Sequence, residues 1–415
     1  MPSALPAPAH TLITVVNHLL KTGEITAPCA VVDVAAFDSN AQKMTARTQG
    51  LPIRVASKSL RSTHALRRAL SHPGYQGILS FTLPESINLV REGFTDIVCA
   101  YPSVNVPAIR EIAHDDDLRR NITLMVDSVE LLDLIRSAIR DSADTSNFTQ
   151  PGAPEDQALR VAIDLDCTLH LPGAVIGPRR SPIRTPEQTR ALAQEITSRP
   201  ELKLVGLMAY EGQVASVPDG ESGIVGSVKR WLRSTSMEQL GPRRKACIEA
   251  AREFADLEFV NGGGTGSLDV SAAEGTLTEL AAGSGFYTPV IFDNFADINH
   301  KPSAYFVCQV SRLPAEGWAT VNSGGWIASG PAGQDRLPVP VYPAGLGYST
   351  TEGPGEVQTP LHGHATKSLT VGDAVWFRHA KAGEMTENVD SIVAVNPDGT
   401  YEIWDTYRGK GWTCR

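Results

Sequence analysis

The sequence predicts an α/β protein: a (β/α)₈ barrel of the TIM type followed by a C-terminal, mainly-β domain. Three observations lead to this fold class. The chain has 415 residues, 42% of them hydrophobic, which is enough for two or three domains. Short β-rich runs alternate with helical patterns between residues 53 and 287. Helical patterns nearly vanish after residue 295, where strand-like runs and Gly/Pro/Asp turns take over.

The β-rich runs of the first part define the barrel. They occupy residues 53–57, 77–81, 96–102, 121–128, 160–166, 203–210, 257–264 and 278–287. The segments between them show helical periodicity and capping residues. Strands that alternate with helices imply a parallel sheet, and about eight such repeats match a closed barrel. A doubly wound open sheet is the alternative.

The domain plan follows from these runs. We expect an N-terminal helix within residues 1–25, the barrel over 26–294 and the β domain over 295–415. The strand at 28–34 precedes the barrel repeats and can join the β domain instead. The stretches 141–158 and 214–228 are polar and rich in Gly, Pro and Ser, so we predict exposed loops there.

Charge and cysteine content limit the partners and the cellular compartment that we expect for the protein. The formal net charge is −9, and no basic stripe marks a nucleic-acid or anionic-membrane partner. No apolar run approaches the length of a membrane span, and the N-terminus lacks the pattern of a signal peptide. The six cysteines are scattered without a C-x-x-C pair. Such cysteines fit reduced thiols, so we expect a cytoplasmic protein.

Lys58 is the strongest single candidate for a catalytic residue. It directly follows the apolar strand predicted at 53–57. A lysine is expensive to bury there unless it has a partner or a function. The functional interpretation is a Schiff-base lysine that attacks an aldehyde. The alternative is an exposed lysine at the start of a helix.

A glycine-rich run, 261–267, follows the strand predicted at 257–264. Its glycines let backbone N–H groups converge on an anion, and its Thr and Ser can donate hydroxyls. It lacks the lysine of a Walker P-loop, and an ordinary tight turn is the alternative. The segment 283–285 (Gly-Ser-Gly) can complete a phosphate cradle from the next strand. A lysine and a phosphate cradle at one barrel mouth together point to pyridoxal phosphate (PLP).

Two further clusters are open to interpretation. Arg179, Arg180 and Arg184 can bind a substrate carboxylate or the cofactor phosphate, or can lie in a solvated loop. His362 and His364 would share one face of a strand and could chelate a metal. No third ligand is evident beside them, so a surface or interface role is favoured.

The motifs, in their order, resemble the fold-type III PLP enzymes. Within them the chain is similar to the D-threonine aldolase and D-serine dehydratase group, with an alanine-racemase-type barrel, in a branch of amino acid deaminase/aldolase proteins. The segments that carry the resemblance are TAPCAVVDVAAFDSN, IRVASKS, GFTDIVCAYP, GLMAYEGQ, VNGGGTGS and AAGSGFY.

The resemblance assigns roles to residues at the barrel mouth. It makes Lys58 the cofactor lysine and places Gln213 where the group usually has His. The expected cofactor-binding residues are Lys58, Arg54, Tyr210, Gln213, Asn261, Gly263, Gly264, Thr265, Gly283, Ser284 and Tyr287. From the residues themselves, we expect Arg180 and Asp166, which ends the fifth β-rich run, 160–166, to contact the substrate.

The segment RHAKAGE resembles the group's metal-binding segment in the β domain. There His-x-Asp or His-x-Cys binds a divalent metal, but this chain has His379 and Lys381. A protonated lysine repels a metal, so we predict no metal site. As a hypothesis, the Lys381 ammonium takes over the electrostatic role of the metal near the substrate's β-hydroxyl.

The predicted activity is that of a PLP-dependent lyase, D-threonine aldolase-like. It would cleave or form the Cα–Cβ bond of a D-β-hydroxy-α-amino acid, giving glycine plus an aldehyde. His379, aided by Lys381, is the predicted base for the β-hydroxyl proton. The resemblance also implies a homodimer with a small amino acid substrate.

Several alternatives remain open. A D-serine or D-3-hydroxyaspartate dehydratase would give a 2-oxo acid and ammonia, and an amino acid racemase would only exchange enantiomers. A PLP-binding protein without turnover, or a TIM-barrel sugar or phosphate enzyme without PLP, belongs to a different class.

Overall fold

The computed structural model describes residues 6–140 and 157–414. The predicted loop at 141–158 therefore lies almost wholly outside the described residues. The chain divides into two compact units. The barrel unit comprises residues 44–58, 70–283 and 413–415, and the sheet unit comprises residues 1–43, 59–69 and 284–412.

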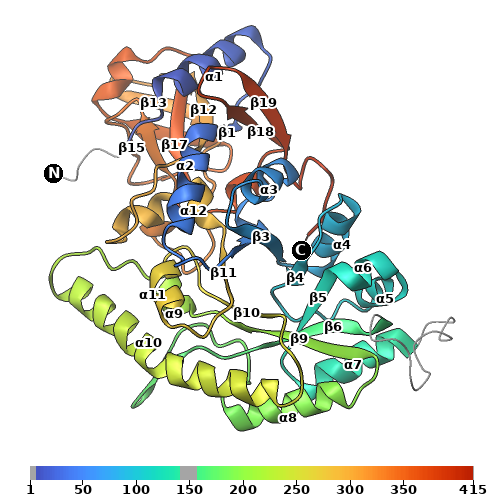
Figure 1. Cartoon of the computed structure of the whole chain (residues 1–415). Helices are drawn as coiled ribbons and strands as arrows, with labels where there is room; N and C mark the ends of the chain where they lie inside the picture. Colours follow the sequence, from blue (N-terminus) through green and yellow to red (C-terminus); the bar gives the residue numbers. More distant parts are fainter. Residues whose placement is uncertain (1–5, 141–156, 415) are drawn as a thin grey trace. The chain divides into compact units, whose positions relative to one another are not determined.

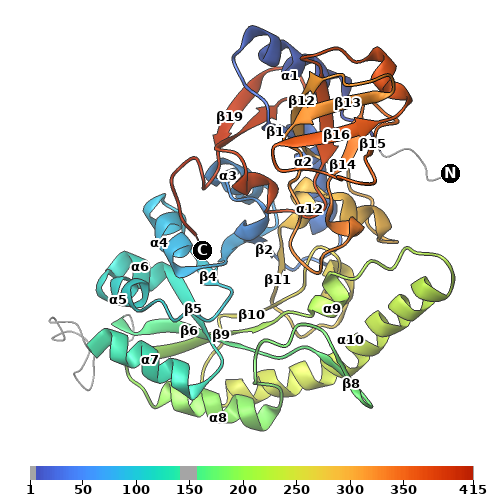
Figure 2. The same cartoon turned by 180° about the vertical axis from the view of Figure 1, so that it is seen from behind.

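Within the described residues of the barrel unit, eight parallel strands close into a barrel (Figures 1 and 2). The strands are β2 (Ile53–Ala56), β3 (Tyr75–Ser80), β4 (Ile97–Cys99), β5 (Ile122–Val126), β6 (Leu159–Asp164), β9 (Leu202–Ala209), β10 (Phe259–Gly262) and β11 (Glu279–Ala282). Each overlaps one of the predicted β-rich runs, and β3, β6 and β9 begin one or two residues before theirs. The pairing of β11 with β2 closes the sheet, which confirms the barrel and excludes the open doubly wound alternative.

Helices cover the outside of the barrel (Figure 2). They include α4 (Leu83–Arg91), α5 (Val106–His114), α6 (Asp116–Asn121), α7 (Val129–Arg140), α8 (Pro186–Thr197), α10 (Gly223–Arg252) and α11 (Leu268–Ala273). Local sequence explains their starts and faces. Thr185 and Gln188 form a capping box at the start of α8. In α7, Leu131, Leu132 and Ile135 are buried at the spacing of one helix face.

The predicted loop at 214–228 is wrong over much of its length. The short helix α9 (Gly212–Ala215) ends inside it, and α10 begins at Gly223. Ile224, Val228 and Trp231 recur at i, i+4 and i+7, which is a helical period. The glycine and serine content of this stretch obscured that period.

A buried ion pair links three neighbouring strands inside the barrel. Arg54 of β2 donates from Nε and Nη2 to the two carboxylate oxygens of Glu279 in β11, at 2.7 and 2.8 Å. The Asn261 amide of β10 donates to the same carboxylate at 2.8 Å, and Asp96 accepts from Arg54 Nη1 at 2.9 Å. Glu279 begins β11 and Asp96 directly precedes β4, so Arg54 lies toward the N-terminal ends of the strands.

This position corrects the expected cofactor role of Arg54. Ligands of such barrels bind at the opposite, C-terminal ends of the strands. The guanidinium is 2% exposed and is engaged by Glu279 and Asp96. The Asn261 side chain is directed to the same carboxylate. We therefore interpret Arg54 and Asn261 as residues that hold the barrel together.

The sheet unit is built on one nine-stranded sheet among its described residues. Its strands are β1 (Cys29–Asp33), β12 (Ala304–Arg312), β13 (Trp318–Asn322), β14 (Val339–Tyr342), β15 (Gly347–Tyr348), β16 (Gln358–His362), β17 (Ala374–Arg378), β18 (Ser391–Val395) and β19 (Tyr401–Asp405). The early strand β1 lies between β12, antiparallel to it, and β18, parallel to it. This mainly-β part of the fold confirms the predicted fold class.

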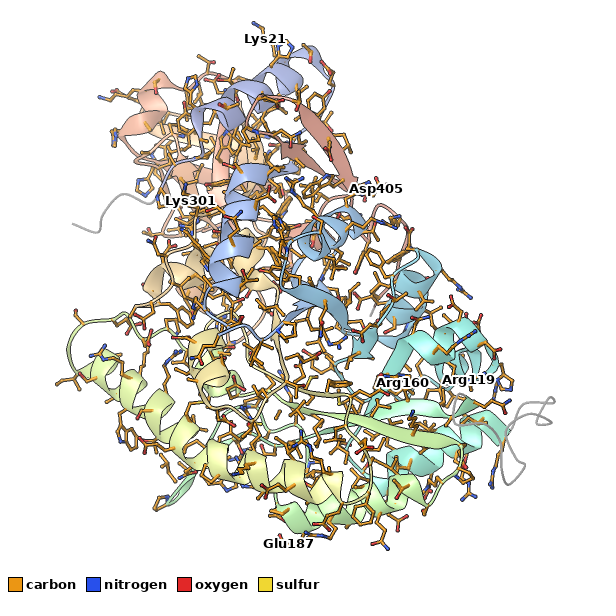
Figure 3. All side chains as sticks on the ribbon, viewed as in Figure 1. Lys21, Arg119, Arg160, Glu187, Lys301 and Asp405 are labelled. Carbon is orange, nitrogen blue, oxygen red and sulfur yellow. The ribbon has the colours of Figure 1, made fainter. Side chains whose placement is uncertain are left out.

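Among its described residues, the sheet unit contains the helices α1 (His10–Thr22) and α12 (Ser284–Tyr287) and most of α2 (Val34–Thr45) and α3 (Thr63–Leu70). Helix α1 buries Leu12, Val16 and Leu19 in one core with Val31 and Trp376. Charged side chains such as Lys21, Glu187 and Asp405 are exposed (Figure 3). None of the helices in the described part of the chain has both the length and the hydropathy needed to cross a membrane.

The ion pair inside the barrel leads to a stability prediction. Glu279→Gln leaves the buried Arg54 charge without its main partner, so the free energy of unfolding should fall by about 3 kcal/mol. Glu258→Gln, in the more exposed Arg160–Glu258 pair, is the matched control and should cost less than about 1 kcal/mol. Urea unfolding followed by circular dichroism measures both. Equal losses in the two variants would contradict this role of the buried pair.

Candidate active site

Polar side chains gather where the barrel strands end. Because the strands are parallel, their C-terminal ends lie on one rim of the barrel. The residues at or just after these ends are Lys58 after β2, Tyr101 after β4, Asp127 after β5, Asp164 at the end of β6, Tyr210 after β9, Gly263 after β10 and Gly283 after β11. The predicted lysine and both predicted glycine turns thus follow strands of the same barrel.

Lys58 lies beside a tyrosine that carries an altered pKa. The lysine is in a 3₁₀ turn, Ser57–Ser59, and its side chain is exposed. Its Nζ donates a hydrogen bond of 2.9 Å to Tyr101 Oη. The Arg180 guanidinium lies 5.5 Å from the centre of the same ring. Burial alone would raise the pKa of Tyr101, but Lys58 and Arg180 outweigh it and hold this pKa below its usual value.

A carboxyl group with a raised pKa lies on the same rim. Burial raises the pKa of Asp164 to about 7, and the Asp127 carboxylate adds to the shift. Arg180 acts in the opposite direction, because its positive charge favours the ionised form. Asp164 is therefore protonated in part of the molecules near neutral pH and can exchange a proton there.

Asp166 organises the loop that carries Arg180. Its carboxylate accepts from Thr168 N at 3.0 Å, from Thr168 Oγ1 at 2.8 Å and from Arg184 Nη1 at 2.7 Å. Ser181 Oγ, next to Arg180, donates to the Asp164 carbonyl at 2.7 Å. A direct substrate contact by Asp166 stays a prediction, and the observed contacts indicate a positioning role.

The glycine turn after β10 packs against Tyr210. Gly263 has φ +80°, a left-handed conformation that favours glycine. A Cβ on Gly264 would lie 2.9 Å from Ala215 Cβ and 3.3 Å from Tyr210 Cε2. Glycine is therefore required where the turn meets the aromatic ring. The Tyr210 hydroxyl is 2.9 Å from Ser216 Oγ.

Gln213 has a buried side-chain oxygen that makes no hydrogen bond to the described residues. Its side chain is 6% exposed, and Nε2 donates to the Cys167 carbonyl at 2.6 Å. Within the described residues, its Oε1 is buried without a hydrogen-bond partner. A buried acceptor without a partner is unfavourable in the protein alone and suits a ligand group that donates to it.

The remaining predicted residues belong to the sheet unit. His379 is 3% exposed, and burial, with the neighbouring Arg378 charge, lowers its pKa to about 3. Tyr287 is buried, donates to the Leu60 carbonyl at 3.3 Å and meets His379 edge to face. Lys381 Nζ donates to the Ser329 carbonyl at 3.2 Å. His379 is thus a weak base, and the contacts of Tyr287 are those of a core residue.

The histidine pair does not share a strand. His362 ends β16, contacts the Tyr348 carbonyl at 3.0 Å and packs against Trp318, whereas His364 begins a 3₁₀ turn. The assumed i, i+2 geometry is therefore wrong. In the described part of the chain, no group of three or more His, Cys, Asp or Glu side chains has an arrangement that could hold a metal.

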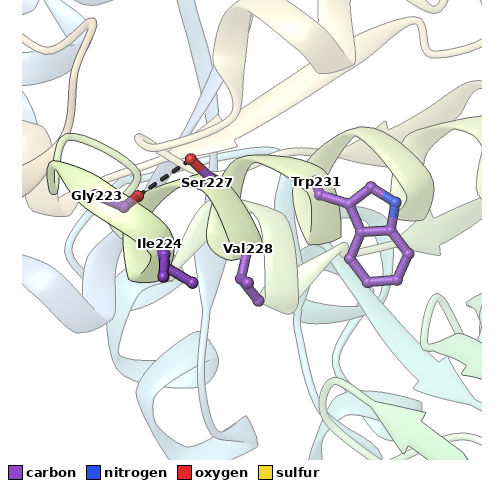
Figure 4. Close-up of a pocket in the computed structure, with 5 residues that line it drawn as sticks. All are labelled: Gly223, Ile224, Ser227, Val228 and Trp231. Carbon is purple, nitrogen blue, oxygen red and sulfur yellow. Dashed lines mark hydrogen bonds between the residues drawn. The ribbon is translucent and has the colours of Figure 1, made fainter.

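A separate hollow lies on α10, lined by Gly223, Ile224, Ser227, Val228 and Trp231 (Figure 4). Ile224 is 84% exposed and Trp231 is 52% exposed. The side chains that line it are mostly apolar. Because a PLP site needs converging polar groups, this hollow does not extend the rim site.

The sequence places Tyr101 and Glu211 after barrel strands, but the prediction gave neither of them a role in the site. Tyr101 follows its strand in the same way as Lys58 does, and this shared position was the available signal. Glu211 follows Tyr210 and is fully buried. A charged residue next to a predicted strand end gives no sign of burial, because burial depends on the partner that the fold supplies.

Comparison with known proteins identifies the family. The family model for the alanine racemase N-terminal domain matches residues 32–275, which is more than half of the chain. The chain therefore belongs to this family of fold-type III barrels, as the motifs predicted.

Two curated relatives are similar to this chain in sequence. One is 3-hydroxy-D-aspartate aldolase of Paracoccus denitrificans (strain Pd 1222), 24% identical over 286 residues, with 67% of this chain and 64% of the relative covered. The other is D-threonine aldolase of Arthrobacter sp, 26% identical over 272 residues, with 62% and 60% covered. The matches thus span less than two thirds of each relative's length.

Solved structures agree with the fold. D-threonine aldolase from Filomicrobium marinum superposes with a TM-score of 0.75 at 20% identity, covering 93% of this chain and 96% of that chain. D-threo-3-hydroxyaspartate dehydratase from Delftia sp. HT23 superposes with a TM-score of 0.67 at 19% identity, covering 94% and 98%. At these identities the likeness shows a shared fold.

The raised pKa of Asp164 predicts a pH dependence of stability. In the folded protein this carboxyl keeps its proton up to about pH 7, whereas the ordinary pKa of an aspartate side chain is 3.8. Between these values the folded state binds more protons than the unfolded chain, so the contribution of Asp164 to stability falls as pH rises.

Asp164→Asn should therefore lose less stability than the parent between about pH 4 and about pH 7, by at most about 4 kcal/mol. Thermal unfolding across this range measures the effect. Asp256→Asn, at an exposed position, controls for the substitution itself. Parallel pH curves for the parent and Asp164→Asn would contradict the raised pKa.

Proposed function

We propose that this chain is a PLP-dependent lyase that cleaves or forms the Cα–Cβ bond of a D-β-hydroxy-α-amino acid, giving glycine and an aldehyde. The observation that carries the proposal is the Lys58 amine beside Tyr101 and Arg180 on the rim of an alanine-racemase-type barrel. The printed activities of the two curated relatives, both aldolases, support this choice.

The residues present fit PLP. Lys58 supplies an exposed primary amine for the cofactor aldehyde. The turn that contains Gly263, Gly264 and Thr265 supplies close backbone approach for its phosphate. Gln213 supplies a buried acceptor without a partner. Gly283, Ser284 and Tyr287 complete the proposed set, with Tyr287 acting through packing. When bound, PLP supplies an electron sink for the bond that breaks at Cα.

The protein's own groups then move one proton. Tyr101 is a better base for the β-hydroxyl proton than His379, because a group with a pKa near 3 seldom takes a proton from an alcohol. The lowered pKa of Tyr101 favours the phenolate that is needed. Arg180 remains the proposed partner of the substrate carboxylate, because a guanidinium binds a carboxylate through two hydrogen bonds.

Lys381 keeps its proposed electrostatic role toward the β-hydroxyl, in place of a metal. The D-3-hydroxyaspartate dehydratase reaction is the second candidate, since Asp164 could donate a proton to a leaving hydroxyl. We also propose a cytoplasmic homodimer that acts on a small amino acid.

Lys58→Ala tests the proposal directly. The parent protein should bind PLP and develop its visible absorbance, and the variant should not, because it lacks the amine that binds the aldehyde. With D-threonine, the parent should release glycine and acetaldehyde, both measured by chromatography. A 2-oxo acid with ammonia would favour the dehydratase, enantiomer exchange alone the racemase, and bound PLP without any product the non-catalytic protein. A parent that does not bind PLP would refute the proposal.

Tyr101→Phe should lower kcat by about a hundredfold or more, because the ring stays and only the proton acceptor is lost. Binding of PLP should persist, since Lys58 is unchanged. In the parent, activity should rise with pH through the lowered Tyr101 pKa, and this limb of the pH profile should disappear in the variant. Tyr75→Phe, at the start of β3, is the control. An unchanged pH profile in Tyr101→Phe would show that another group is the base.

A further inference from the structure

We propose that Glu211 is a positioning residue that sets the glycine turn in the conformation that receives the cofactor phosphate, although the carboxylate itself bears the same sign of charge as the phosphate. This inference rests on the proposed PLP chemistry and names the part of the protein that makes the phosphate site.

Glu211 is bound to the turn through both carboxylate oxygens. Its side chain is fully buried, directly after β9. Oε1 accepts from Ser267 Oγ at 2.8 Å and also from the Ser271 hydroxyl. Oε2 accepts from the backbone N–H of Gly263 at 3.2 Å. One carboxylate thus connects the first residue of the turn, its last residue and the following helix α11.

Two arginines hold the outer part of the same turn. Arg47 Nη1 donates to the Thr265 carbonyl at 2.8 Å, and Arg233 Nη2 donates to the Gly266 carbonyl at 3.1 Å. In a trans peptide the N–H points opposite to the C=O. The Gly266 N–H therefore points away from Arg47. The carboxylate holds the peptide before Gly263, and the two arginines hold the peptides that follow Thr265 and Gly266, so both parts of the turn have a fixed orientation, as a backbone anion site requires.

The carboxylate is compensated, so it need not repel an anion. Arg244, equally buried, donates to Glu211 Oε2 at 2.7 Å. Burial would raise the pKa of Glu211, but Arg244 and the two serine hydroxyls outweigh burial and keep the pKa low. Arg244 also donates to the Ala209 carbonyl and to Glu274. The Arg244–Glu211 pair is bound to β9 through the Ala209 carbonyl. Its two opposite charges nearly cancel at the glycine turn.

A buried ion pair can also serve stability alone, and the barrel provides a matched control. The Arg54–Glu279 pair is similarly buried in the same unit, but it lies toward the N-terminal ends of the strands. Glu279→Gln and Glu211→Gln remove the same charge from comparable surroundings. Glu211 contacts the turn at Gly263 and Ser267, whereas Glu279 contacts Asn261, which lies in β10 before the turn, so only the loss of Glu211 should act on phosphate.

The experiment compares PLP with pyridoxal, which carries the same aldehyde but no phosphate. Apo-protein of the parent, Glu211→Gln and Glu279→Gln is titrated with each compound, and binding is followed by visible absorbance. Glu211→Gln should weaken PLP binding about tenfold or more and change pyridoxal binding by less than about twofold. Glu279→Gln should leave both affinities within about twofold of the parent. Inorganic phosphate should compete with PLP in the parent and less effectively in Glu211→Gln.

The outcomes separate the two proposals. Equal weakening of PLP and pyridoxal in Glu211→Gln, or no change in either, would overturn the role of Glu211. A parent that binds neither compound would overturn the proposed function itself. If Glu211→Gln does not fold, Ser271→Ala removes one hydrogen bond to the carboxylate and should show the same selective loss on a smaller scale. Its absence would again count against the proposal.

Discussion

Closure of the barrel between β11 and β2 is the constraint on which the site depends. In an open sheet with the strands in chain order, β2 would lie at one edge and β10 and β11 at the other. The pairing of Leu280 with Ile53 joins these edges. Closure therefore makes β2, which Lys58 follows, the direct neighbour of β11 and places β10 next beyond β11, although more than 200 residues separate Lys58 from Gly263 along the chain. The pairing of β11 with β2 therefore brings Lys58 and the glycine turn after β11 to neighbouring positions on the rim.

Buried charges that have partners connect the barrel strands near both of their ends. Burial of an isolated charge is strongly unfavourable, so such groups persist only when their partners are in place. Toward the N-terminal ends, Arg54 of β2, Glu279 of β11 and Asn261 of β10 join three consecutive strands of the barrel, across the seam between β11 and β2. At the C-terminal end, Glu211 joins the end of β9 to the turn after β10. The geometry of the rim is thus specified by polar contacts as well as by hydrophobic packing.

The sequence predicted the periodic and the local features of this molecule. All eight barrel strands, the lysine after the first of them and the glycine turn after β10 could be located, because strand runs, glycine and lysine each have local signatures. The partners of buried charges could not be located in this way. Arg54 is followed closely by Lys58 in the chain, and both suggested a cofactor site. Only the register of β2 against β11 shows that Arg54 pairs with Glu279, toward the opposite end of the barrel. His379 likewise gave no local sign of its burial.

The charge of the rim differs from that of the whole chain. The formal net charge of −9 would repel an anionic cofactor or substrate at long range. At the rim, however, Lys58 and Arg180 are both positive and flank one phenol. Asp164, the carboxyl with the raised pKa, is largely neutral below about pH 7. Glu211 is neutralised by Arg244. Protonation of Asp164 and pairing of Glu211 with Arg244 reduce the negative charge that Asp127 and its neighbours place near the lysine and the arginine. Such a surface attracts a phosphate or a carboxylate within a Debye length, where the local charges outweigh the screened charge of the rest of the molecule.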